Sequence, residues 1–301
     1  MTERCTPREN PMYTVTTEEF DHLTLGDLSL RARIYRPAGD GPFPAYVDLH
    51  GGAWFKGGYA NNDPINRALA ARGVVVMAAD YRLPPEGTYP ASVADANHAV
   101  RWLKLNAARF GTRADMVGIM GTSAGGHLAV LTALKPFDPR YAALPLEGGA
   151  GIDARVASVV ALWPVICPAT RYQENLEREA RGDTSLAGRA GAGHGQMTYW
   201  LNEATMQDGS PVYALERGDP IDLPDMLYVQ GAGDALHLPR NMDRFIAGYR
   251  KAGGQVETEL MEGDHFDAPR SMPGSALAQR VFDHIAEFAS GARRTGEDPA
   301  A

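Results

Sequence analysis

The chain has 301 residues, of which 44% are hydrophobic and 22% charged, values that are typical of a soluble globular protein. The formal net charge is −8 and no Lys/Arg cluster is present, so we expect no nucleic-acid partner. The two cysteines, Cys5 and Cys167, exclude a disulfide framework and a zinc site built from cysteines.

The chain also lacks the apolar segments that membrane insertion or secretion would require. The longest apolar stretch, 157–169, is too short for a span and contains two prolines. The charged first ten residues are not followed by an apolar run, so they do not match a secretory signal. We therefore expect a cytoplasmic protein that does not bind a membrane.

Apolar, β-branched runs alternate along the chain with amphipathic segments. Strands are predicted at 17–25, 28–37, 44–50, 73–80, 116–121, 156–165, 226–231 and 255–262. Helices are predicted at 62–72, 91–110, 124–135, 239–252 and 275–289. The run 74–77 has no polar alternation, which indicates a strand that is covered on both faces. The pattern predicts an α/β fold with a mostly parallel sheet.

One stretch, 169–215, interrupts this alternation and is too long for a simple strand-to-helix connection. Its glycine-rich part, 182–195, follows no strand, so it indicates a flexible hinge rather than a phosphate-binding loop. Four side chains of this stretch either line a binding cavity or form the small core of an insertion, and the sequence leaves both open: Tyr172, Met197, Tyr199 and Trp200.

Residues 121–125 read Gly-Thr-Ser-Ala-Gly, a G-x-S-x-G motif. It follows the predicted strand 116–121 and precedes the predicted helix 124–135, which is the context of a nucleophile elbow. The elbow is a sharp turn that exposes a serine Oγ, and its glycines allow backbone to approach backbone. Ser123 is therefore the candidate nucleophile.

A second motif, His50-Gly51-Gly52-Ala53-Trp54, follows the predicted strand 44–50. Consecutive small residues let a backbone turn its amides toward a pocket, where they can hold a developing oxyanion. Standing alone, the motif could also be a plain tight turn, the less favoured of the two interpretations. Its combination with the elbow favours the oxyanion interpretation.

These two motifs, together with Asp80-Tyr81-Arg82-Leu83-Pro84-Pro85-Glu86 and Gly126, resemble the hormone-sensitive-lipase-like branch of the α/β-hydrolases. The patterns of that family are HGGG, DYRLAPE and GxSAGG, so Ala53 replaces a glycine and Pro85 an alanine. The HGGAW form is also similar to arylformamidase-type and feruloyl-esterase-type relatives. The resemblance covers residues 28–290 and implies an α/β-hydrolase fold, with an eight-stranded, mostly parallel sheet, helices on both faces and a helical cap.

The resemblance implies a triad in the order serine, acid, histidine. Asp234 follows the predicted strand 226–231, and His265 follows the predicted strand 255–262, in turns similar to those of the family. They are the candidate acid and base of Ser123. The candidate oxyanion hole consists of the backbone N–H groups of Gly52, Ala53 and Ala124, and the reaction requires no metal and no cofactor.

Other titratable residues fit these roles less well. Among the histidines, His127 lies in a helix, His194 in the insertion, His237 very close to Asp234 in sequence, and His284 in the last helix. Among the acids, Asp225 precedes its strand, while Asp264 and Asp267 are expected to cap or solvate a loop. We expect Asp80, Arg82 and Glu86 to form a structural network in the turn after their strand.

The predicted organisation has a core, a cap and two ends. The core comprises 23–168 and 216–290, the cap is the insertion 169–215 to which 1–22 contributes, and 291–301 is a disordered tail.

The leading functional hypothesis is a serine carboxylesterase for small to medium acyl esters, with a small-molecule ester as its partner. The first alternative is an arylformamidase or other amide hydrolase with the same triad. A second alternative is a non-catalytic small-molecule-binding protein, which the presence of all three triad residues disfavours. A peptidase is disfavoured because the chain lacks a propeller domain.

Two further expectations concern assembly and pH. The strand 255–262 could pair two copies into a homo-oligomer. Activity should fall below about pH 6–7 as the histidine base is protonated.

Overall fold

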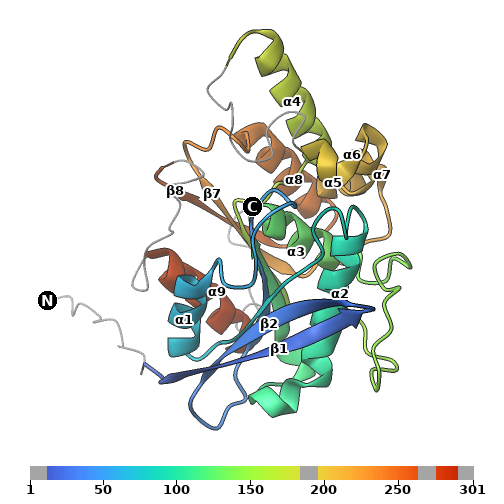
Figure 1. Ribbon diagram of the computed structural model, residues 1–301. Helices are drawn as coiled ribbons and strands as arrows, with labels where there is room; N and C mark the ends of the chain where they lie inside the picture. The colour runs from blue at the N-terminus through green and yellow to red at the C-terminus, as the bar shows by residue number, and fades with distance from the viewer. Residues whose placement is uncertain (1–11, 184–195, 264–275, 291–301) are drawn as a thin grey trace, which may run out of the picture.

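The computed structural model describes residues 12–183, 196–263 and 276–290, and in these ranges eight strands form one sheet (Figure 1). The strand order is β1-β2-β4-β3-β5-β6-β7-β8. β2 runs antiparallel to its neighbours β1 and β4, and the strands from β4 onward in this order are parallel. The predicted α/β architecture with a mostly parallel sheet is confirmed.

The strands are β1 Val15–Leu25, β2 Leu28–Pro37, β3 Ala45–Leu49, β4 Val75–Ala79, β5 Val117–Thr122, β6 Ser158–Leu162, β7 Asp225–Gly231 and β8 Val256–Met261. The helices of the layers beside the sheet are α1 Asp63–Ala71, α2 Ala91–Leu105, α3 Ala124–Leu134, α8 Pro239–Lys251 and α9 Ala276–Ser290. Every predicted strand and helix is present, and the ends differ by a few residues. The largest change is that α2 ends at Leu105 and a separate 3-10 turn, Ala107–Phe110, follows it.

Helices cover both faces of the sheet because its central strands are apolar on both sides. In β4, Val75, Met77 and Ala79 belong to one hydrophobic cluster, whereas Val76 and Ala78 belong to the other. Helices α2, α3 and α8 contribute to the first cluster, and α1 and α9 to the second. Figure 1 shows α1 and α9 side by side on their face. The absence of alternation in 74–77 thus reflects burial on both faces.

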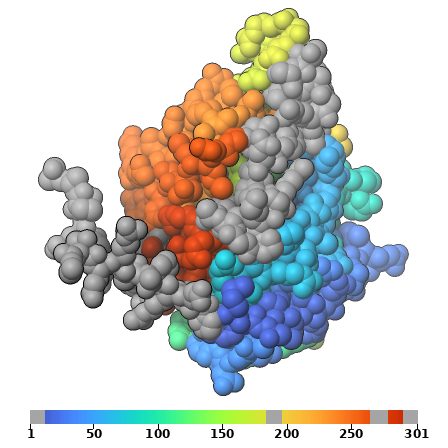
Figure 2. Space-filling view, turned by 90° about the vertical axis from the view of Figure 1, so that its left-hand side faces the viewer, coloured from blue at the N-terminus to red at the C-terminus, as the bar shows by residue number. Residues whose placement is uncertain are grey.

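The insertion forms helices beyond the carboxyl ends of the parallel strands. These are α4 Pro168–Ala180, α5 Met197–Trp200, α6 Glu203–Asp208 and α7 Pro211–Arg217. α4 stands out from the body of the molecule, at the top of Figure 1 and of the space-filling view in Figure 2. The bounds 169–215 expected for the insertion each differ from the observed helix ends by one or two residues.

The expected assignment of 1–22 to the cap is wrong from Val15 onward. Val15–Leu25 forms β1, which pairs along its length with β2 at the edge of the sheet. The boundary at residue 22 therefore cuts a strand, whose partly exposed face weakened its apolar signal in the sequence. Residues 1–11 and the predicted tail 291–301 lie outside the described residues.

Candidate active site

Ser123 lies in the sharp turn between β5 and α3. Its φ of 55° and ψ of −114° are values that residues other than glycine rarely adopt. Three backbone hydrogen bonds hold this conformation: its N–H donates to the Leu162 carbonyl at 2.9 Å, and its carbonyl accepts from His127 at 2.9 Å and Val165 at 3.2 Å. Strain of this kind costs about 1–3 kcal/mol and persists only where the surroundings enforce it, as they do here.

The two glycines of the motif are required by the close approach of backbone to backbone. A Cβ at Gly121 would lie 2.4 Å from the carbonyl oxygen of Gly125. A Cβ at Gly125 would lie 2.0 Å from the carbonyl oxygen of Leu49 and 2.4 Å from that of His50. The first turn of α3 therefore packs directly against the end of β3.

The loop after β3 is as strained as the elbow. Gly52 has a φ of +133°, and a Cβ there would lie 1.8 Å from the carbonyl oxygen of Lys56. Ala53 and Trp54 follow with φ values of 52° and 66°. The Gly52 carbonyl accepts hydrogen bonds from Phe55 and Lys56, both at 3.2 Å, which turns the chain back on itself. The chain therefore forms a tight loop directly after β3.

Loop and elbow lie close together in space. A Cβ on Gly51 would lie 3.4 Å from the Cβ of Ser123. Within the described residues, the backbone N–H groups of Gly52, Ala53 and Ala124 donate to no backbone carbonyl. Ala124 is also the first residue of α3, where the helix dipole favours negative charge. These unused amides beside Ser123 are the groups an oxyanion hole requires.

Asp234 follows β7 and is 3% exposed. Its Oδ1 accepts the backbone N–H groups of Leu236 at 2.8 Å and His237 at 3.0 Å. Its Oδ2 accepts the Gln230 side-chain amide at 2.6 Å. Three donors on one buried carboxyl group hold it in one orientation.

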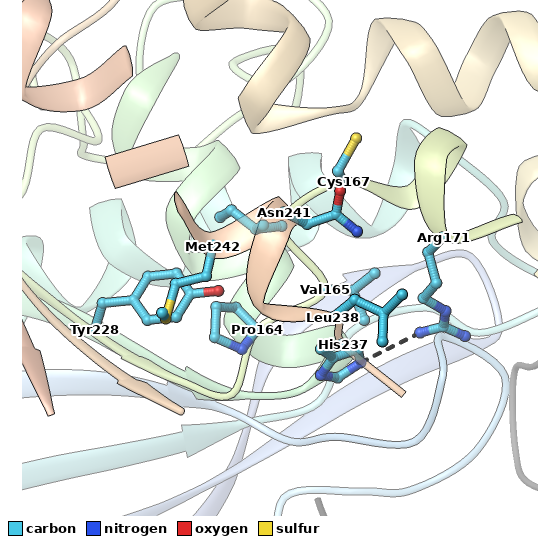
Figure 3. Close-up of a pocket in the computed structure, with 10 residues that line it drawn as sticks. Pro164, Val165, Cys167, Arg171, Tyr228, His237, Leu238, Asn241 and Met242 are labelled. Carbon is cyan, nitrogen blue, oxygen red and sulfur yellow. Dashed lines mark hydrogen bonds between the residues drawn. The ribbon is translucent and has the colours of Figure 1, made fainter. Parts of the chain in front are cut away.

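Two residues outside the predicted triad lie beside this acid. His237 Nδ1 is 3.4 Å from Asp234 Oδ2, and His237 Nε2 is 3.4 Å from Nη1 of Arg171, a residue of α4 (Figure 3). Since a guanidinium only donates, the second contact requires a lone pair on Nε2, so a neutral His237 carries its proton on Nδ1, toward Asp234. His237 had been set aside as too near Asp234 in sequence, but the turn places it against the carboxylate.

The Arg171 guanidinium is buried and also lies over the Trp54 ring, 5.7 Å from its centroid. Burial lowers its pKa to about 10, while the charges of Asp234 and Glu174 act in the opposite direction. Figure 3 shows Arg171 reaching from α4 toward the small pocket that contains His237 and Tyr228. That pocket has a volume of about 10 Å³, room for one water molecule. Nothing in the sequence pattern marked Arg171.

The predicted base, His265, lies outside the described residues, as do His194, Asp264 and Asp267. Among the rival residues that are described, Asp225 begins β7, at the opposite end of the sheet from Ser123. His284 is fully buried in α9.

His127 is a packing residue in the first turns of α3. It is fully buried, accepts a hydrogen bond from the Trp54 indole on Nδ1 at 3.2 Å, and contacts the Gly209 carbonyl through Nε2 at 2.8 Å. Because an indole N–H only donates, Nδ1 carries the lone pair and Nε2 carries the proton. Burial lowers the pKa of His127 to about 4, which keeps the ring neutral.

The turn after β4 is structural, but its contacts differ from the expected network. Arg82 binds the buried carboxylate of Asp95 on α2, with Nη2 at 2.7 Å and the backbone N–H at 2.8 Å. Asp80 instead accepts the Tyr59 backbone N–H at 2.7 Å, and Glu86 is exposed. The expected network among Asp80, Arg82 and Glu86 is therefore wrong. Arg82 points inward and binds Asp95, a carboxylate further along the chain than Asp80 or Glu86.

The aromatic residues of the insertion form core rather than a cavity wall. Tyr199 and Trp200 are fully buried, and the Tyr199 ring stacks on that of Trp54 with centroids 5.4 Å apart. Tyr172 is 5% exposed and belongs to the same hydrophobic cluster, against which Met197 packs. Of the two interpretations left open by the sequence, the packing one holds for these residues.

In the three described ranges, no helix is both long and apolar enough to cross a membrane. The same ranges contain no group of three histidine, cysteine or carboxylate side chains arranged to hold a metal ion.

Comparisons with known proteins connect this geometry to a family. Residues 33–183, half of the chain, match the family model described as BD-FAE. The matched range includes the HGGAW loop and the elbow but ends before Asp234.

A curated relative, the probable carboxylic ester hydrolase LipM of Mycobacterium tuberculosis, is 35% identical over 271 residues. The alignment covers 86% of this chain and 57% of LipM, so the chain spans little more than half the length of that relative.

Solved structures share the fold along nearly the whole chain. An arylesterase structure superposes with a TM-score of 0.70 at 23% identity, covering 91% of this chain and 84% of that one. The esterase Est2 of Thermogutta terrifontis, solved with propionate bound, gives a TM-score of 0.66 at 25% identity, with coverages of 98% and 99%. The α/β-hydrolase fold predicted from the sequence is confirmed.

Proposed function

The chain belongs to the BD-FAE family and has the α/β-hydrolase fold, and on that basis we propose that it is a serine carboxylesterase acting on small to medium acyl esters. The observation that carries the proposal is the pair of strained turns that lie close together: Ser123 at a φ of 55° and the loop at Gly52 and Ala53 beside it. Backbone strain maintained at two adjacent turns, beside the amides of Gly52, Ala53 and Ala124 that donate to no backbone carbonyl, is characteristic of a site that stabilises a developing charge.

In the proposed reaction Ser123 Oγ attacks the ester carbonyl carbon while His265 accepts its proton. The carbonyl oxygen becomes an oxyanion, which the N–H groups of Gly52, Ala53 and Ala124 stabilise; loss of one such donor typically costs about 3–4 kcal/mol. His265 then protonates the leaving alcohol, and an acyl-enzyme remains on Ser123. A water molecule, deprotonated by His265, releases the acid and restores the serine.

Asp234 is proposed to orient His265 and to stabilise its imidazolium form. Its two backbone donors and the Gln230 amide support this role, since they fix the orientation of the buried carboxyl group. In the sequence His265 follows the end of β8, and β8 lies next to β7, the strand whose following turn carries Asp234.

The acyl-chain class rests on the cap and on a relative. Tyr199 and Trp200 of α5 pack into the core beside Trp54, which leaves few large apolar side chains of the described cap free to line a long acyl tunnel. Est2, a protein of the same fold, has propionate bound, which is a short carboxylic acid anion. Both support small to medium acyl groups.

The test is the hydrolysis of p-nitrophenyl acetate, butyrate and octanoate and of a formanilide by the wild type and by Ser123→Ala. We expect ester turnover that prefers acetate or butyrate, and a fall of about 10⁴-fold or more in kcat for the variant. Faster turnover of the formanilide would favour the arylformamidase alternative. A wild-type protein inert toward all four substrates would contradict the proposal.

A further inference from the structure

A group of buried polar side chains lies directly beneath the candidate site. Asp48 of β3 is 2% exposed, and its carboxylate accepts the Asn62 side-chain amide at 3.0 and 3.1 Å and the Asn66 amide at 2.8 Å. The Asn62 amide nitrogen also donates to Thr122 Oγ1 at 3.2 Å. Asn62 thus joins the end of β3 to the end of β5.

The sheet register explains why these residues meet. In the parallel pair of β3 and β5, Asp48 lies opposite Met120, so Thr122, two residues further on, points to the same face. That face is the one covered by α1, since Tyr46, Met120 and Leu69 belong to its cluster. Asn62 immediately precedes α1 and Asn66 lies in its first turn, so both amides reach the carboxylate from above the sheet.

The hydrogen-bonding capacity of Asn62 suits this bridging position. A carboxamide nitrogen carries two N–H groups, and that of Asn62 lies within hydrogen-bond distance of both the Asp48 carboxylate and Thr122 Oγ1. Burial raises the pKa of Asp48 to about 6, while the hydrogen bonds from Asn66 and Asn62 lower it. The two asparagine amides are the donors that hold the Asp48 carboxylate in place. The same hydrogen bonds fix the orientation of the Asn62 side chain.

The two strand ends that Asn62 joins carry the two halves of the proposed machinery. Thr122 is bonded to Ser123, and Asp48 is separated from the Gly51–Ala53 amides by only Leu49 and His50. A Cβ on Gly51 would lie 3.1 Å from the Thr122 carbonyl oxygen, so a small shift of either strand end would change the spacing of the loop and the elbow.

We propose that Asn62, held by Asp48, is a positioning residue that sets the distance between Ser123 Oγ and the oxyanion-hole amides through Thr122. The inference rests on the proposed esterase function. Asn62 touches no reacting atom, so its contribution is one of alignment, which is realised in the transition state more than in substrate binding.

The experiment compares Thr122→Val, which removes the acceptor at nearly constant shape, with Thr122→Ser, which keeps the hydroxyl group. For p-nitrophenyl butyrate we expect kcat to fall tenfold or more in Thr122→Val with KM within twofold of wild type, and Thr122→Ser to recover most of kcat. Asn62→Ala should show the same defect, and the double variant Asn62→Ala/Thr122→Val should be no slower than the slower single variant, because both remove one interaction.

The control is Tyr35→Phe, which removes the hydrogen bond from Tyr35 to Asp63 at 2.8 Å, another contact between α1 and the sheet that lies away from the elbow. Melting temperatures identify variants that do not fold. If Thr122→Val fails to fold, the same kcat and KM criteria apply to Asn62→Ala. A control that lowers kcat as much as Thr122→Val, or a folded Thr122→Val within twofold of wild type, would overturn the inference.

Paraoxon separates this failure from failure of the proposed function. It phosphorylates a reactive serine and releases p-nitrophenol, so the wild type should release one equivalent and Thr122→Val should do so at least tenfold more slowly. Equal rates in the two proteins would overturn the positioning role alone. A wild type that neither hydrolyses the esters nor reacts with paraoxon would overturn the proposed function and the inference with it.

Discussion

Gly125 illustrates how the absence of a side chain shapes the site. Gly125→Ala would place a Cβ 2.0 Å from the Leu49 carbonyl oxygen, a backbone atom that cannot turn aside. We expect the elbow to move away from the loop after β3, with loss of ester hydrolysis and a lower melting temperature.

The matched control for this prediction is Gly58→Ala, whose Cβ would make an ordinary 3.4 Å contact with Asp80 Oδ1. It should retain activity. A Gly125→Ala protein as active as Gly58→Ala would show that the observed packing of α3 on β3 is not required.

Asp234 is the second residue with a sharp expectation. Asp234→Asn keeps the shape but removes the charge and lets the side chain favour the wrong tautomer of the histidine, so kcat should fall by about 10³–10⁴-fold. Asp225→Asn changes the same residue type at the opposite end of β7 and should leave kcat within twofold. Steady-state kinetics on p-nitrophenyl butyrate would decide, and equal effects of the two substitutions would exclude Asp234 as the acid.

At the scale of elements, the insertion 169–215 is held to the core by aromatic packing. The Trp200 ring lies 5.3 Å from that of Trp54 and 5.4 Å from that of His127, measured between centroids, and it is fully buried. Trp200→Ala should therefore lower the free energy of unfolding by about 3–5 kcal/mol, as large-to-small core substitutions do.

Leu201→Ala is the neighbouring control, because Leu201 is 57% exposed and its loss should change the free energy of unfolding by about 0.5 kcal/mol or less. Urea denaturation measures both. Equal free energies of unfolding for Trp200→Ala and wild type would mean that this packing of the insertion on the core does not stabilise the fold.

At the scale of the whole molecule, its buried histidines predict that folding stability falls at acidic pH. Burial lowers the pKa to about 4 for His22, His50, His98 and His127. In the unfolded chain the pKa of histidine is near 6.5, so between about pH 6.5 and 4 the unfolded state binds more protons and folding stability falls as the pH falls. In this window each histidine lowers the free energy of unfolding by up to about 1.4 kcal/mol for each pH unit of acidification. The raised pKa of Asp48, about 6, acts in the opposite direction below pH 6 and offsets the effect of one histidine.

The free energy of unfolding, measured with urea at pH 7 and pH 5, checks this prediction. His22→Gln retains a donor for the Asp80 carbonyl, which His22 Nε2 contacts at 3.0 Å, but cannot be protonated. The free energy of unfolding of His22→Gln should differ less between pH 7 and pH 5 than that of the wild type, by about the contribution of one titrating histidine. Equal stability of the wild type at pH 7 and pH 5 would contradict the assignment of these rings as neutral.

The possible homo-oligomer also belongs to this scale and stays a prediction. β8 is the last strand in the sheet order, so its outer edge is a surface on which a second copy could pair. Light scattering distinguishes the states: the monomer mass is 32.4 kDa, and a single species of that mass would exclude the pairing.

The sequence by itself determined the element types, their order, the elbow at Ser123 and the loop at Gly52, because these depend on hydrophobic periodicity and on motifs of a few adjacent residues. The sequence could also suggest Asp234 as the acid, since a carboxylate in the turn after a predicted strand can be recognised from adjacent residues alone. The tertiary structure alone decided that Arg82 binds Asp95 and that Arg171 of α4 reaches His237. It also decided that Tyr199 is core and that Asn62 bridges two strand ends. These contacts join segments that are far apart along the chain. The partner that each side chain meets depends on how the layers of the fold pack, and a local sequence pattern does not encode that packing.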